Sequence, residues 1–166
     1  MIKNVIFDVG QVLVAWEPVE AMRALGMDEE TVRAVADATV HTSDWDEADR
    51  GALSDEELLT SFIRKAPAYE AQIRNFWEHV DRAIYPFPYV GEWMRTLKDK
   101  GYHLLYLSNC GRAYMDIHAE SFGLRNYFEH MYCSGDYDQK PKYEIFNVIK
   151  EEYPSEYLMV GDRFHD

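Results

Sequence analysis

The chain contains little cysteine: only Cys110 and Cys133 occur among its 166 residues. Two cysteines at this separation match no metal-binding spacing and no disulfide framework, so a disulfide-stapled domain and a cysteine-based zinc site are excluded. Both residues are predicted to be thiols in a reducing compartment, which favours a cytoplasmic location.

Long apolar runs are also absent. No stretch approaches the ~20 apolar residues that a membrane-spanning helix requires. The beginning of the chain has only Lys3 before a brief apolar run, which is too short for a signal peptide. We therefore expect a protein without a membrane partner.

Positive charge is scarce as well. Lysine and arginine number 17 against 30 aspartates and glutamates, which leaves a formal net charge of −13 and a pI near 4.8. Such a chain repels nucleic acid and anionic membrane surfaces, so no nucleic-acid partner is expected. Any phosphate that it binds must be held by a local cluster of cations.

Apolar residues make up 47% of the chain, enough for one ordinary domain or for a core domain with a small helical insertion. Residues 18–83 are predicted to be helical, with a capping box in which Glu57 follows Ser54 by three residues. Pro86 and Pro88 then interrupt the helical pattern. The expected organisation is a core domain of residues 1–15 and 86–166 and a helical cap of residues 16–85.

Within the core domain, apolar strands alternate with amphipathic helices. Strands are predicted at 5–7, 104–107, 130–133 and 158–160, and helices at 90–97, 114–122 and 143–149. This alternation predicts an α/β fold with a parallel, doubly wound sheet.

Each predicted strand ends on a polar group suited to phosphate or metal. The groups are Asp8 with Gly10 behind it, Ser108-Asn109, Asp136 followed by Lys140, and Asp162. Taken alone, each would have a structural explanation: Ser108 would cap a helix, Lys140 would be a solvated loop lysine, and Asp162 with Asp166 would be a surface acidic pair. In a parallel sheet, however, the carboxyl ends of all strands share one edge, where open α/β sheets bind ligands.

The stretches FDVGQVL, LYLSNCG, QKPKYEIF and VGDRFHD, in this order, resemble the four motifs of the haloacid dehalogenase-like (HAD) hydrolase superfamily. The first motif is similar to that of the sugar-phosphatase, glucose-1-phosphate phosphatase-like branch, FD-x-G-x-V. The resemblance spans essentially the whole chain. It implies a HAD-like Rossmannoid sheet with a helical cap inserted after the first strand, and a core that continues past Asp166 in the family, so that its C-terminal part is expected to be missing.

The resemblance also implies a Mg²⁺-dependent phosphatase for a small phosphorylated metabolite such as a sugar phosphate. Asp8 would be the nucleophile that forms an aspartyl-phosphate, and Lys140 would neutralise the developing charge. Asp8, the carbonyl of Gly10 and Asp162 would hold Mg²⁺, supported by Asp166. Ser108 and the backbone N–H of Asn109 would bind phosphate oxygens.

Two other functions remain open. The first is dehalogenation, in which an aspartate displaces halide from carbon without a metal. Two carboxylates beside a nucleophilic aspartate repel one another without a cation, and this favours Mg²⁺ and phosphate. The second is a binding or regulatory domain without turnover, because Gly10 stands where most HAD phosphatases have a second, acid–base aspartate.

Overall fold

The computed structural model describes residues 2–49, 53–138 and 140–162. The chain divides into two compact units, one of Met1–Ala15 with Pro86–Asp166 and one of Trp16–Tyr85. Among the described residues, none of the helices combines the length and the apolar character needed to cross a bilayer.

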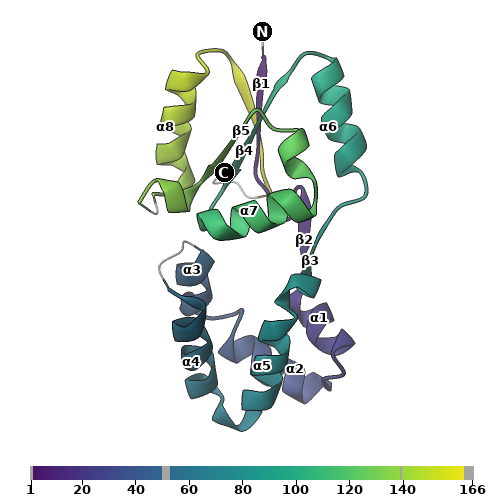
Figure 1. Ribbon diagram of the computed structural model, residues 1–166, viewed down its shortest axis with the longest axis vertical. Helices are drawn as coiled ribbons and strands as arrows, with labels where there is room; N and C mark the ends of the chain where they lie inside the picture. Colours follow the sequence, from purple (N-terminus) through teal and green to yellow (C-terminus); the bar gives the residue numbers. More distant parts are fainter. Residues whose placement is uncertain (1, 50–52, 139, 163–166) are drawn as a thin grey trace. The chain divides into compact units, whose positions relative to one another are not determined.

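The first unit is built on a four-stranded parallel sheet (Figure 1). Its strands are β1 (Asn4–Phe7), β4 (His103–Ser108), β5 (His130–Cys133) and β6 (Tyr157–Val160), in the order β5-β4-β1-β6. All three pairings are parallel, with Phe7 opposite both Tyr106 and Val160. The predicted parallel α/β fold is confirmed. β-branched and aromatic residues dominate β1 because the strand is buried throughout.

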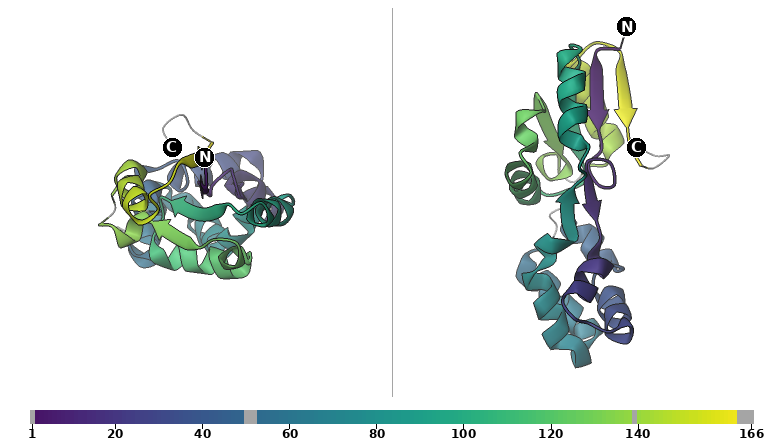
Figure 2. Two further views of the ribbon diagram at one scale, coloured as in Figure 1. Left: turned by 90° about the horizontal axis from the view of Figure 1, so that it is seen from above. Right: turned by 90° about the vertical axis from the view of Figure 1, so that its right-hand side faces the viewer.

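Helices cover both faces of this sheet (Figure 2). On one face, Ile145 and Ile149 of α8 (Lys142–Glu152) pack in a cluster with Ile6, Leu105 and other strand residues. On the other face, Trp93 of α6 (Val90–Asp99) meets Phe7 edge-on, with ring centroids 5.0 Å apart. Successive strand residues face opposite sides of the sheet, so Ile6 packs against α8 on one face and Phe7 packs against α6 on the other.

The connections between β4, β5 and β6 complete the unit. Helix α7 (Arg112–Ser121) and the short helix η3 (Leu124–Asn126) join β4 to β5, and η4 (Ser134–Asp136) follows β5. Gly101 follows Lys100, the C-cap residue of α6, and takes a positive φ of 81°. A glycine in this left-handed conformation is a common way to end a helix.

The second unit is helical. It comprises α1 (Pro18–Ala24), α2 (Glu29–Ala38), α3 (Ser43–Asp49), α4 (Asp55–Lys65) and α5 (Glu70–Glu78), with η1 (Pro67–Tyr69) and η2 (Val80–Ala83). The predicted capping box of α4 is present: Glu57 N–H donates to Ser54 Oγ, and Ser54 N–H donates to Glu57 Oε2. The predicted helical character of this stretch is confirmed.

Two short strands were not expected from the sequence. They are β2 (Val14–Trp16) and β3 (Ile84–Pro86), which pair in a two-stranded sheet where the chain passes between the units (Figure 2). Each strand is three residues long, and almost seventy residues of sequence separate β2 from β3. No local periodicity predicts such a pairing.

Candidate active site

The candidate site lies at the carboxyl edge of the four-stranded sheet. Because the strands are parallel and in register, the residues that follow β1, β4, β5 and β6 emerge at one edge. The N–H of Asp8 donates to the carbonyl of Val160 over 2.8 Å, which extends the β1–β6 pairing by one residue. Asp8 is thereby held beside the end of the strand that leads to Asp162.

The Asp8 carboxylate is almost fully buried and has two identified donors. Its Oδ1 accepts from the N–H of Val9 at 2.7 Å, and its Oδ2 lies 2.6 Å from the Nζ of Lys142. The side chains of Lys142 and Asp8 are only 11% and 9% exposed. Charge-assisted hydrogen bonds of this length stabilise the carboxylate anion, the form that acts as a nucleophile.

Lys142, rather than Lys140, is the lysine that the structure brings to Asp8. Lys142 is the first residue of α8, and Pro141 before it is extended. Lys140 is 53% exposed, with its Nζ 3.7 Å from Glu144 Oε2. The sequence reasoning missed Lys142, although the stretch Lys140-Pro141-Lys142 offered two candidates.

Ser108 and Asn109 lie at the end of β4, opposite the end of β5. Ser108 is half-buried and pairs in register with Cys133, whereas Asn109 is exposed. Tyr106, two residues before Ser108, is buried, and burial raises the pKa of its phenol well above the ordinary value. Tyr106 therefore remains a neutral phenol.

The segment after Asn109 is joined to the residues that follow β5 by a backbone hydrogen bond and an ion pair. The carbonyl of Cys110 accepts from the N–H of Gly135 at 3.1 Å, and Arg112 forms a two-pronged ion pair with Asp136, including an Nε–Oδ1 distance of 2.9 Å. A Cβ on Gly135 would lie 3.0 Å from both the Arg112 nitrogen and the Gly111 Cα. Any larger residue at position 135 would require the neighbouring backbone to shift by a few tenths of an ångström.

The turn behind Asp8 does not need glycine at position 10. Gln11, with a φ of 58°, takes the left-handed conformation, whereas Gly10 has no positive φ. A Cβ on Gly10 would meet no atom within 4 Å. The carbonyl of Val9 accepts from the N–H groups of Leu13 and Val14, so Val9 closes the turn.

The oxygen donors at this edge suit a hard cation. Asp8 and Asp162 follow the paired strands β1 and β6, and Gly10 supplies a backbone carbonyl in the turn. Mg²⁺ commonly takes one or two protein carboxylates and completes its shell with water and substrate oxygens, so this set fits. Within the described part of the chain, no group of three or more His, Cys, Asp or Glu residues gathers as a metal cluster. Asp166 lies outside the described residues.

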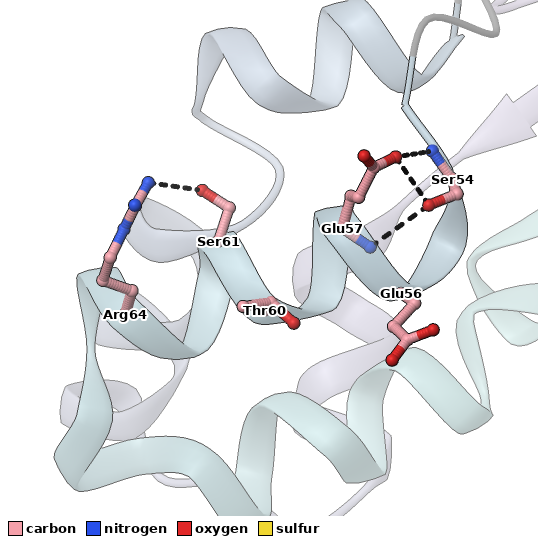
Figure 3. A pocket seen from close by; sticks show the side chains of 6 residues that line it. All are labelled: Ser54, Glu56, Glu57, Thr60, Ser61 and Arg64. Carbon is pink, nitrogen blue, oxygen red and sulfur yellow. Dashed lines mark hydrogen bonds between the residues drawn. The ribbon is translucent and has the colours of Figure 1, made fainter.

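The helical unit contributes a shallow polar groove along α4, about 590 Å³ in volume (Figure 3). Several of its residues are engaged locally, since Glu57 belongs to the capping box and Ser61 is hydrogen-bonded by Arg64 at 3.5 Å. Trp45, Phe62 and Trp77 pack together within the unit, with ring centroids about 6 Å apart. These aromatic side chains therefore serve the unit's own core.

The parallel sheet with helices on both faces defines an α/β protein, and its carboxyl edge carries the buried lysine–aspartate pair. A family model of the haloacid dehalogenase-like hydrolases matches residues 2–166. The chain belongs to this family. Among curated protein sequences, none matches it significantly.

Solved structures resemble the chain at low identity. YfnB from Bacillus subtilis, assigned to the HAD hydrolases and bound to magnesium, has 19% identity and a TM-score of 0.65, and the match covers 98% of this chain and 78% of that one. L-2-haloacid dehalogenase from Xanthobacter autotrophicus, with chloropropionic acid covalently bound, has 17% identity and a TM-score of 0.62, with 96% and 69% covered. A predicted phosphoglycolate phosphatase from Haemophilus somnus has 18% identity and a TM-score of 0.53, with 97% and 77% covered. These likenesses concern the fold.

Proposed function

We propose that this HAD-family hydrolase cleaves the phosphate monoester of a small metabolite, such as a sugar phosphate, through an aspartyl-phosphate on Asp8. The observation that carries the proposal is the nearly buried ion pair between Asp8 Oδ2 and Lys142 Nζ at the end of β1. An ionised carboxylate at a ligand-binding strand end needs no base to become a nucleophile.

In the first step, an Asp8 oxygen attacks phosphorus, and the bond to the leaving alkoxide breaks. In the second, water attacks the same phosphorus, which releases inorganic phosphate and restores the carboxylate. Ser108 and the Asn109 N–H orient the phosphate oxygens, and Lys142 offsets the negative charge of Asp8 and of the transferring group.

We infer that Asp8, the carbonyl of Gly10 and Asp162, with support from Asp166, are the residues that would hold Mg²⁺. When bound, the ion would supply positive charge for the phosphate oxygens. The donor chemistry supports this inference, and one structural neighbour is bound to magnesium.

The insertion of Trp16–Tyr85 between the first and second strands of the sheet supports a role as a lid over a small substrate. We place the protein in the cytoplasm, since its two cysteines are thiols and its net charge disfavours nucleic acid and membrane surfaces.

The test is a screen of small phosphomonoesters and of 2-chloropropionate, each with Mg²⁺ and with a chelator. Phosphate release that requires Mg²⁺, together with a phosphoryl group trapped on the Asp8 peptide after acid quench, is expected. Chelator-insensitive halide release would instead assign the dehalogenase reaction. Binding of phosphomonoesters without release of either product would assign a non-catalytic role.

A further inference from the structure

The turn behind Asp8 is contacted at its far end by the segment of residues 87–89. The Tyr89 hydroxyl donates to the carbonyl of Val12 at 3.0 Å, across 77 positions of sequence, and the N–H of Phe87 donates to the carbonyl of Leu13 at 3.0 Å. Val12 and Leu13 are buried, whereas Tyr89 is 49% exposed. Tyr89 therefore reaches a buried turn from the surface of the core unit.

Three successive hydrogen bonds connect this hydroxyl with the candidate nucleophile. Tyr89 Oη donates to the Val12 carbonyl, and the Val12 N–H donates to the Val9 carbonyl at 3.3 Å. The Val9 N–H in turn donates to Asp8 Oδ1 at 2.7 Å. Gly10, whose carbonyl is the expected Mg²⁺ ligand, lies between Val9 and Val12 in the chain. A shift of Val12 therefore reaches both Asp8 and Gly10.

The turn also contains a backbone conformation that needs support. Gln11 has a φ of 58°, in the left-handed region that residues other than glycine adopt at a cost. Residues in such regions persist where the surrounding structure holds them. The N–H of Gln11 donates to the carbonyl of Val14 at 2.8 Å, which closes the turn from inside. Tyr89 adds a contact from outside the turn.

Tyr89 is itself fixed by a series of aromatic contacts. Its ring stacks on Phe87, with centroids 5.3 Å apart and an interplanar angle of 8°, and it meets Trp93 edge-on at 6.0 Å. Trp93 in turn meets Phe7, the residue before Asp8, at 5.0 Å. These are contacts of the ring and not of the hydroxyl. The hydroxyl can therefore be removed while the packing is kept.

We propose that Tyr89 is a positioning residue for the candidate active site. Its hydroxyl holds the turn of residues 9–13, so that the Gly10 carbonyl and the Asp8 carboxylate keep the positions that Mg²⁺ binding and attack on phosphorus require. Tyr89 acts through Val12 and Val9, not on the reacting atoms. The holding of the turn stands on these contacts alone, whereas its consequence for Mg²⁺ and turnover rests on the proposed function.

Tyr89→Phe removes a single neutral hydrogen bond, and the net contribution of such a bond corresponds to about a two- to tenfold change in an equilibrium constant. We expect the dissociation constant for Mg²⁺, measured by isothermal titration calorimetry without substrate, to rise by about this factor. The Mg²⁺ concentration needed for half-maximal activity is expected to rise with it. The KM for the phosphate ester at saturating Mg²⁺ should stay unchanged, because Ser108 and Asn109 follow a different strand.

Amide hydrogen exchange of the full chain, without metal or substrate, tests whether the hydroxyl holds the turn. The N–H groups of Leu13 and Val14 donate to the Val9 carbonyl at 2.9 and 3.1 Å, so their exchange reports on the turn directly. In Tyr89→Phe this exchange is expected to accelerate about two- to tenfold, while the amides of β4 keep their wild-type rates. An equal acceleration in β4 would assign Tyr89 to general stability and overturn the proposal.

Tyr127→Phe is the matched control. The Tyr127 hydroxyl accepts from Arg95 at 3.4 Å, and Tyr127 precedes β5, at the opposite edge of the parallel sheet from Asp8. The same chemical change there is expected to alter neither the exchange of the turn nor Mg²⁺ binding.

The remaining outcomes separate the proposal from the proposed function. Wild-type exchange of the turn in Tyr89→Phe would overturn the proposal. Faster exchange at wild-type Mg²⁺ affinity would refute the link to the metal site. Faster exchange of the turn in Tyr89→Phe, where the wild type itself neither binds Mg²⁺ nor cleaves any ester, would support the holding of the turn and count against the proposed function alone.

Discussion

Lys142 Nζ and Asp8 Oδ2 are 2.6 Å apart, and both side chains are about nine-tenths buried. The two residues are far apart in the sequence. They meet because α8 packs against the sheet in which β1 is an inner strand. This ion pair distinguishes Lys142 from Lys140, which is two residues earlier in the sequence and is paired with Glu144 instead.

The first prediction compares these two lysines. Lys142→Met is expected to lower kcat/KM on the order of 10²–10³-fold, because a fixed positive charge beside the reacting group is lost. Lys140→Met is the matched control and is expected to stay within a few-fold of the wild type. Steady-state kinetics on folded samples measures both. A large loss in Lys140→Met with little loss in Lys142→Met would return the role to Lys140.

The second prediction concerns the nucleophile. Asp8→Asn is expected to abolish turnover and phosphoryl trapping while the circular dichroism spectrum stays unchanged, since the side chains are nearly equal in volume and the Val9 N–H keeps an oxygen acceptor. Asp162→Asn is the comparison variant: it should raise the Mg²⁺ concentration needed for half-maximal activity but leave Asp8 able to react. Clear Mg²⁺-dependent activity in pure Asp8→Asn would remove Asp8 from the mechanism.

The third prediction uses the open space at Gly10. Gly10→Asp is sterically allowed, because a Cβ there meets no atom within 4 Å and the backbone has no positive φ. A general acid contributes typically about 10²–10⁴-fold, so the variant is expected to gain activity on alkyl phosphates, whose leaving groups need a proton. The wild type is expected to prefer aryl phosphates.

Gly10→Asn is the control for the third prediction, because it adds the same shape without an acid. Relative rates on an aryl and an alkyl phosphate are the measurement. Equal wild-type rates on both substrates, or an equal gain in Gly10→Asn, would show that the missing carboxylate does not limit turnover.

The fourth prediction tests how the end of β5 holds the phosphate-binding segment. Gly135→Ala places a Cβ 3.0 Å from Arg112 N and Gly111 Cα, both backbone atoms that cannot yield without moving residues 108–112. A rise in KM of about tenfold or more is expected, because Ser108 and Asn109 lose their position.

Gly91→Ala is the matched control for the fourth prediction. Its Cβ also makes a close contact, 3.2 Å, but with the hydroxyl of the Tyr127 side chain, and the position lies within α6. The expected result is unchanged kinetics and a gain of roughly 0.5–1 kcal/mol in stability from removing a helical glycine. An unchanged KM in Gly135→Ala would mean that residues 108–112 are not held in place by the contact of Gly135 with Gly111 and Arg112.

The fifth prediction concerns the range of substrates. If Trp16–Tyr85 serves as a lid, activity is expected on small phosphomonoesters and not on a folded phosphoprotein. Parallel assays with a panel of sugar phosphates and a phosphorylated protein decide this. Efficient release of phosphate from the protein, with none from the small esters, would contradict a lid role.

The amino-acid sequence alone determined the elements whose signals are local. Apolar runs predicted β1, β4, β5 and β6, and the capping box at Ser54 predicted the start of α4. The order of the motifs also predicted the family, which the match over residues 2–166 confirms. These signals are local because hydrophobic periodicity and capping act within one or two turns of chain.

Only the tertiary structure decided which of these residues meet. The choice of Lys142 over Lys140 depends on where α8 begins and on the face it turns to the sheet. The β2–β3 pairing joins segments separated by the whole helical unit. Such contacts arise from the packing of distant segments, and a short window of sequence contains no record of them.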